Sequence, residues 1–169
     1  NPTLDQATNT QYVFLNRTSK LWCPVKGAPA PYIVWRKDGV TVQNSTSITF
    51  QLQVTSEDNV NYSCEVRRDG EVLRRNISLR IEECPGPCEC DVFHQTIVSV
   101  NCDGKSFNSI AWKFPPAMSK LHLRNNKLRD LPQGIFSNYT QLEWLDIRDN
   151  QLKELPSGIF SNNTKLSAL

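Results

Sequence analysis

The chain has 169 residues, of which 38% are hydrophobic and 21% are charged, a composition typical of one globular domain or two small ones. The formal net charge of +2 is too small a bias to favour nucleic acid or an anionic membrane surface as the partner. No apolar run is long enough to span a bilayer. We find no secretory leader and therefore expect a mature or trimmed form.

The cysteines and the glycosylation motifs point to one compartment. Six cysteines favour an oxidising environment, in which disulfides persist. The acceptor pattern Asn-x-Ser/Thr recurs along the chain, at Asn16, Asn44, Asn61, Asn76, Asn138 and Asn162. Such a density beside the cysteines predicts an extracellular glycoprotein, either secreted or the ectodomain of a cell-surface protein.

Residues 1–82 show short alternating runs separated by turn signals, which predict an all-β sandwich. Cys23 is followed by Trp35 and then by the motif Asp58-x-x-x-Tyr62-x-Cys64. This order resembles an immunoglobulin-like domain, in which the tryptophan packs on an inter-sheet disulfide, here Cys23–Cys64. The stretch between Trp35 and Tyr62 lacks room for the extra strands of a variable domain, so the resemblance is to the I/C2 type.

The last hairpin of this segment has two interpretations. Ile77, Leu79 and Ile81 alternate and are expected to face the core, with Asp69-Gly70 as the turn. Four arginines make the hairpin basic: Arg67, Arg68, Arg74 and Arg75. They form either a patch for sulfated glycans or an acidic partner, or a solvated edge with Arg68 paired to Glu71. Neighbouring acids and a glycan at Asn76 favour the solvated edge.

The cluster Cys84-x-x-x-Cys88-x-Cys90, with Cys102 twelve residues later, resembles the N-terminal cap of extracellular leucine-rich-repeat proteins. A terminal repeat needs such a cap because no neighbour covers its apolar edge, and a small cap needs covalent staples. The resemblance implies the disulfides Cys84–Cys90 and Cys88–Cys102 within a cap at residues 83–120. A zinc site made by these cysteines and His94 is disfavoured, because zinc sites prefer paired C-x2-C knuckles. We expect no metal.

Residues 121–169 repeat with a period of 24. Leu121-x-Leu123-x-x-Asn126-x-Leu128-x-x-Leu131-Pro132 returns as Leu145-x-Ile147-x-x-Asn150-x-Leu152-x-x-Leu155-Pro156, and Leu169 opens a third copy. This pattern resembles the typical leucine-rich repeat. The predicted fold is therefore an all-β immunoglobulin-like sandwich followed by a disulfide-capped leucine-rich-repeat solenoid. It has short parallel strands on the concave face and little helix.

Each repeat position has a predicted role. The leucines fill the core, and Asn126 and Asn150 turn inward to bond the backbone of adjacent coils. The positions between the core residues face the concave surface, which is the usual binding surface of such arrays: Lys120, His122, Arg124, Trp144, Asp146 and Arg148. Glycans at Asn138 and Asn162 would leave that surface clear. The alternative is a solvated face on which Trp144 lies over its neighbours.

Two repeats and the start of a third leave an apolar edge at Leu166 and Leu169. Repeat arrays need a terminal cap for solubility. We therefore expect the natural chain to continue, or another subunit to cover this edge.

The predicted function is a non-enzymatic recognition module of a cell-surface receptor or adhesion protein, which binds a protein ligand or itself. The alternative is an innate immune protein that binds microbial or sulfated carbohydrate. Neither a catalytic set, a phosphate loop nor a cofactor motif is present. We expect no enzyme, no cofactor, no nucleic acid and no membrane contact within these residues.

Overall fold

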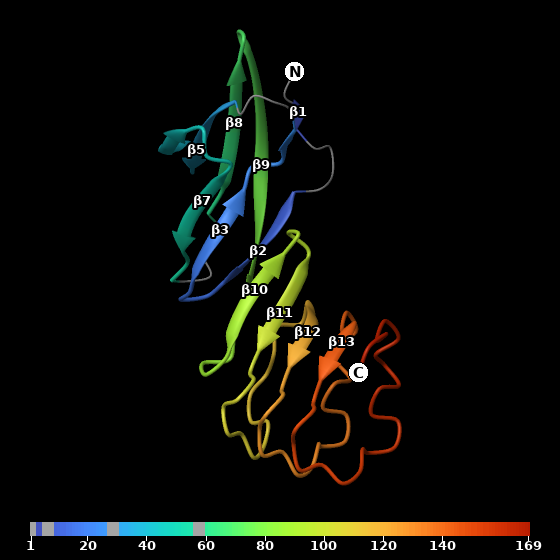
Figure 1. Ribbon diagram of the computed structural model, residues 1–169. Coiled ribbons are helices and arrows are strands. Elements are labelled where there is room, and N and C mark those ends of the chain that lie inside the picture. Colours follow the sequence, from blue (N-terminus) through green and yellow to red (C-terminus); the bar gives the residue numbers. More distant parts are fainter. Residues whose placement is uncertain (1–2, 5–8, 27–30, 56–59) are drawn as a thin grey trace. The chain divides into compact units, whose positions relative to one another are not determined.

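The computed structural model describes residues 3–4, 9–26, 31–55 and 60–169 (Figure 1). It divides the chain into two compact units, Asn1–Ile81 (unit 1) and Glu82–Leu169 (unit 2). Strands and turns make up the secondary structure of the described residues, without a helix. Asp58 of the predicted immunoglobulin motif lies outside the described residues.

Unit 1 contains a five-stranded sheet in the order β2-β9-β8-β5-β6 and a second sheet of β3 and β7. The larger sheet is made of β2 (Thr10–Phe14), β5 (Tyr32–Lys37), β6 (Val40–Ser45), β8 (Tyr62–Arg68) and β9 (Glu71–Glu82). The smaller sheet is made of β3 (Thr18–Trp22) and β7 (Thr49–Gln53), while β1 (Thr3–Leu4) pairs with β4 (Val25–Lys26).

The core of unit 1 is built around a disulfide between Cys23, directly after β3, and Cys64 on β8. Trp35 is fully buried beside it and stacks on Phe50 at 5.8 Å between ring centroids, and Phe50 contacts Tyr62 at 5.9 Å. Burial raises the pKa of the Tyr62 phenol, and the charge of Asp38 raises it further. The packed aromatic rings and the disulfide therefore hold the two sheets together.

The alternation predicted for β9 is present. Ile77 is buried, and Leu79 and Ile81 are partly buried against the same core, while Ser78 and Arg80 between them are exposed, as is Asn76 before them. The sequence prediction of the inward face is confirmed at these positions.

Unit 2 begins with an antiparallel hairpin, β10 (Glu89–Phe93) and β11 (Ile97–Asn101). The disulfide Cys84–Cys90 links β10 to the segment before it, and Cys88–Cys102 joins the residue just before β10 to the residue just after β11. Phe114 and Met118 are buried against Cys88 and Cys102, and Trp112 is partly buried there. The cap thus consists of two staples over a small aromatic and aliphatic cluster.

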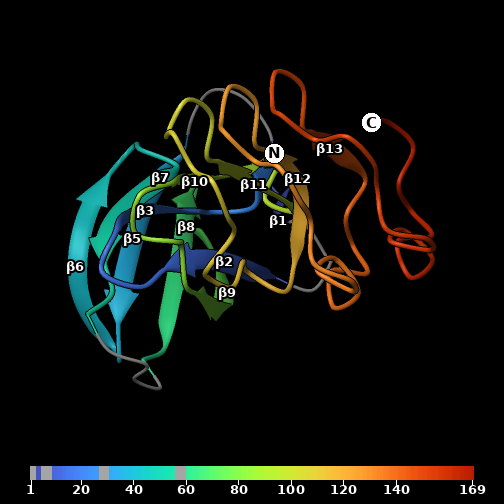
Figure 2. The same cartoon turned by 90° about the horizontal axis from the view of Figure 1, so that it is seen from below.

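The sheet then continues with parallel strands, β12 (Met118–His122) and β13 (Trp144–Asp146), in the order β10-β11-β12-β13. Leu121 pairs with Leu145, which is the sequence period of 24. Figure 2 shows the loops that follow β12 and β13 side by side. The two loops repeat the same hydrogen bonds: Ile135 N to Pro132 O recurs as Ile159 N to Pro156 O, both at 3.2 Å. Successive coils therefore have one backbone conformation.

The inward turn of the two repeat asparagines is confirmed. The Nδ2 atom of Asn126 donates to the carbonyls of Cys102 and Leu123, both at 3.0 Å. Its Oδ1 atom accepts from the amides of Lys105 and Phe107 at 3.1 and 3.0 Å. The buried side chain of Asn126 thus links one coil to the preceding loop by hydrogen bonds.

One expected core position differs between the two coils. Leu131 is 4% exposed, but its equivalent Leu155 is 40% exposed. Leu131 belongs to the buried cluster of unit 2, whereas in the described part of the chain no further coil covers Leu155. The prediction that both leucines are buried in the core is therefore wrong for Leu155.

Candidate functional site

The strands of unit 2 separate core residues from surface residues by simple alternation. Val100, Leu121 and Leu145 are fully buried on one side of the sheet. Their neighbours Asn101, His122 and Trp144 reach the other side, because successive side chains of a strand point to opposite faces. We call this other side the open face of the β10–β13 sheet.

A shallow hollow of about 360 Å³ lies on the open face. Side chains from all four strands line it: Asp91, Phe93, Ser99, Asn101, Lys120, His122 and Trp144. Ser99 is the small, buried member of this set, so larger side chains stand around a low centre. The hollow therefore has the size of a site for one or two protruding side chains of a ligand.

Aromatic rings form part of this hollow. Trp144 and His122, on adjacent strands, lie with their ring centroids 4.5 Å apart and their planes at 51°. Phe93, which is 49% exposed, adds an apolar ring to the β10 side of the hollow. Aromatic groups held in place by neighbours lose little conformational entropy when they bind.

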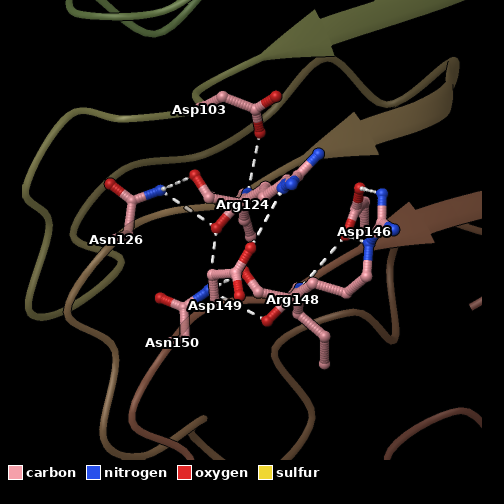
Figure 3. A network of polar contacts seen from close by, with 9 residues as sticks. Asp103, Arg124, Asn126, Asp146, Arg148, Asp149 and Asn150 are labelled. Carbon is pink, nitrogen blue, oxygen red and sulfur yellow. Dashed lines mark hydrogen bonds and ion pairs between the residues drawn. The ribbon is translucent and has the colours of Figure 1, made fainter.

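The predicted ligand set divides into two groups in the structure. Lys120, His122 and Trp144 line the hollow. Arg124, Asp146 and Arg148 instead belong to a polar network at the ends of the strands (Figure 3). The structure thus brings only the first group together with the aromatic surface.

Within that network Asp146 is 5% exposed, so the expectation that it faces a ligand is wrong. Arg148 explains this, because its Nε and Nη2 atoms donate to the two carboxylate oxygens at 2.9 and 2.8 Å. The hydrogen bonds from Arg148 lower the pKa of Asp146 to about 2 despite its burial. Arg124 is also engaged: its Nε donates to Asp149 at 3.1 Å, and its amide donates to Asp103 at 2.7 Å.

Sequence reasoning missed the contribution of the cap to the open face. Asp91 and Phe93 on β10, and Ser99 and Asn101 on β11, line the same hollow as the repeat residues. The alternation of Asp91 and Phe93 along their strand was a usable signal. Their alignment with Lys120 depends on the pairing of β11 with β12, which includes a register shift at Val98/Ser99.

The basic patch of unit 1 is partly neutralised. Glu65 on β8 is 5% exposed and forms ion pairs with Arg36, Arg67 and Arg74 at 3.1, 2.7 and 3.3 Å. Burial raises the pKa of Glu65, but the hydrogen bonds from Arg67 and Arg36 outweigh it, so the pKa lies below its ordinary value. Arg75 is only partly exposed, and the side chain of Arg68 lies outside the description. Two of the four patch arginines are therefore already bound to a buried carboxylate.

The glycosylation motifs all lie at the surface. Each acceptor side chain is exposed: Asn16, Asn44, Asn61, Asn76, Asn138 and Asn162. Asn138 and Asn162 occupy equivalent places, in turns where Tyr139 N bonds Phe136 O and Asn163 N bonds Phe160 O. Neither of these two asparagines lines the hollow on the open face.

The described residues contain no group of three or more His, Cys, Asp or Glu side chains that could hold a metal ion. The cysteines are joined in the three disulfides. No helix in the described part of the chain has the length and apolar character needed to cross a membrane.

Comparison with known families agrees with both architectures. Residues 1–81 match the family model of the immunoglobulin domain, and residues 116–169 match that of the leucine rich repeat. The chain joins an immunoglobulin domain to leucine-rich repeats. Domains of both families are typically non-enzymatic binding modules. The disulfides and the two domain families place this chain outside the cell.

Individual relatives cover the chain in part. Mouse hemicentin-2 is 27% identical over 145 residues, which are 78% of this chain and 3% of that protein. Chicken fibroblast growth factor receptor-like 1 is 40% identical over 68 residues, 36% of this chain and 14% of that protein. Human platelet glycoprotein IX is 32% identical over 65 residues, 38% of this chain and 36% of that protein. The chain therefore spans a small fraction of each.

Among solved structures, the N-terminal four immunoglobulin domains of Dscam1 isoform 1.9 are 26% identical, with a TM-score of 0.36. The match covers 43% of this chain and 18% of that chain.

Proposed function

We propose that this chain is an extracellular, non-enzymatic recognition module of the receptor or adhesion type, and that it binds a protein ligand through the open face of unit 2. The observation that carries the proposal is the hollow in which Trp144, His122 and Phe93 stand around Ser99. Tryptophan in a partly enclosed pocket is the residue most often found at the centre of a protein-binding hot spot.

The polar residues around the hollow supply orientation. Lys120 and Asp91 line it with opposite charges. Arg124 and Arg148 lie at the ends of the strands, where the side chain of Arg124 is about half exposed and that of Arg148 is mostly exposed. Exposed charges at a rim steer association and fix register more than they add affinity. The arginines therefore act as rim groups, and the aromatic residues supply the binding energy.

The proposal also assigns a role to each part of the chain. We assign residues 1–82 to the immunoglobulin-like domain, 83–120 to the cysteine-rich cap and 121–169 to the repeats. The cap has two roles in this assignment. It closes the apolar edge of Leu121 and Leu123, and it contributes two strands to the binding face.

N-glycans at the six exposed acceptor asparagines complete the proposal. Asn138 and Asn162 follow the phenylalanines of the repeat loops, so sugars there would cover the loops and leave the hollow open. A receptor-like relative and a platelet glycoprotein support the receptor or adhesion type. Their small covered fractions make the activity of the whole protein part of the proposal.

A screen against purified extracellular domains tests this function. The chain is presented as a multimer, and saturable binders are measured with Trp144→Ala and with Trp22→Ala. Trp22 is the matched control, because it is 39% exposed on unit 1. We expect Trp144→Ala to weaken binding by about tenfold or more and Trp22→Ala to have no effect. A ligand that is lost with Trp22→Ala and kept with Trp144→Ala would refute the assignment to the open face.

A further inference from the structure

The charges on the open face are sorted by strand. Strand β10 carries the acidic residues Glu89 and Asp91. Strand β11 carries the neutral residues Ser99 and Asn101, and strand β12 carries the basic residues Lys120 and His122. Within the described residues, the side chains of Glu89, Asp91 and Lys120 form no hydrogen bond or ion pair. The charges are therefore available to a partner.

The register arranges these residues in two straight rows. Asp91 pairs with Ser99, and Ser99 pairs with Lys120. One step along the strands, Glu89 pairs with Asn101, and Asn101 pairs with His122. In each row the acid and the base stand on either side of β11, with backbones roughly 10 Å apart at the usual strand spacing. Within the described residues, no ion pair joins the acid and the base of either row across β11.

This layout is complementary to itself. We propose that a second copy of the chain binds face to face on the open face, related by a two-fold axis that runs along β11. A half-turn about that axis lays β10 of one copy over β12 of the other. Asp91 then faces Lys120 of the second copy in both directions, because a two-fold interface repeats every contact. Glu89 likewise faces His122.

The charge pattern selects this axis over the alternative. A two-fold axis across the strands would lay β10 over β10, so that acids face acids, and β12 over β12. Like charges brought together in an interface oppose association. Only the axis along β11 places an acid opposite a base in both rows, and it sets neutral Ser99 and Asn101 at the centre.

The face is small for a protein–protein interface. With the axis along β11, only β10, β11 and β12 overlap, and three strands of about five residues, at roughly 3.3 Å per residue and 4.8 Å between strands, cover roughly 240 Å². A stable pair buries about 800 Å² on each partner. We therefore expect weak self-association in solution, which weakens further as salt screens the charges. This inference deepens the proposed function and rests on it, since it names a second copy as an occupant of the same face.

Sedimentation equilibrium of the complete chain over a concentration series tests the inference. We expect Asp91→Lys alone, and Lys120→Asp alone, to weaken self-association by about tenfold or more, because each leaves like charges in both contacts. An equimolar mixture of the two variants should associate again, because each contact between unlike variants then joins opposite charges. Circular dichroism checks that both variants remain folded.

Control variants make the same charge changes away from the face. Asp130→Lys and Lys153→Asp alter exposed residues in the loops that follow β12 and β13, and they should leave self-association unchanged. The inference is overturned if the wild-type chain stays monomeric at millimolar concentration, if either single reversal associates as the wild type does, or if the mixture stays monomeric. A protein ligand that depends on Trp144 in that case would still support the proposed function, so the two failures are distinguishable.

Discussion

The two repeat asparagines provide a matched pair for testing what holds unit 2 together. Asn126 is 6% exposed and has two buried hydrogen bonds, from its Nδ2 to the carbonyls of Cys102 and Leu123. Its other bonds, to Lys105, Phe107 and Arg124, are partly buried. Asn150 occupies the equivalent place with bonds of similar length, but these are partly buried or exposed.

The difference in burial sets the expected magnitudes. A buried hydrogen bond that is lost without replacement costs about 1–1.5 kcal/mol, and a bond that water can replace costs about 0.5 kcal/mol or less. Asn126→Ala should therefore lower the free energy of unfolding of unit 2 by about 3–4 kcal/mol. Asn150→Ala, whose partners are reached by water, should lower it by about 1–2 kcal/mol.

Urea unfolding combined with hydrogen exchange measures both values within unit 2. The amides of Lys105 and Phe107, which Asn126 accepts from, should lose protection in Asn126→Ala and keep it in Asn150→Ala. Two outcomes would show that the side-chain amides do not hold neighbouring coils together. One is an equal loss of unfolding free energy in the two variants, and the other is an unfolding free energy of Asn126→Ala within 1 kcal/mol of the wild type.

Two further predictions concern charge and modification. Asp146 has a folded-state pKa of about 2, below its ordinary value of 3.8, so its ion pair stabilises the fold above pH ~4 and the contribution is lost as the pH falls through 2. In urea unfolding, Asp146→Asn should cost about 1 kcal/mol at pH 7, because Arg148 is two-thirds exposed. The cost should shrink as the pH falls from about 4 through 2, and a constant difference at all pH values would contradict this. Peptide mapping of chain secreted from eukaryotic cells should find glycans at Asn138 and Asn162, and their removal should leave binding at the open face unchanged. Stronger binding after removal would mean that the sugars reach that face.

The amino-acid sequence alone determined the features that depend on local periodicity. A period of two in β9 places Ile77 in the core, and a period of 24 places Leu121 beside Leu145. It also predicted the inward asparagines, because a polar side chain that recurs at the end of a buried strand has to satisfy backbone groups there. These features need only the spacing of residues along the chain.

Only the tertiary structure decided which side chains share the open face. Asp91 and Phe93 meet Lys120 through the pairing of an antiparallel cap strand with a parallel repeat strand, and a register shift at Val98/Ser99 sets that alignment. Asp146 alternates toward the surface, yet it is buried because the guanidinium of Arg148 folds back over it. Strand register and side-chain pairing depend on residues far apart in the chain, and for that physical reason spacing alone does not specify them.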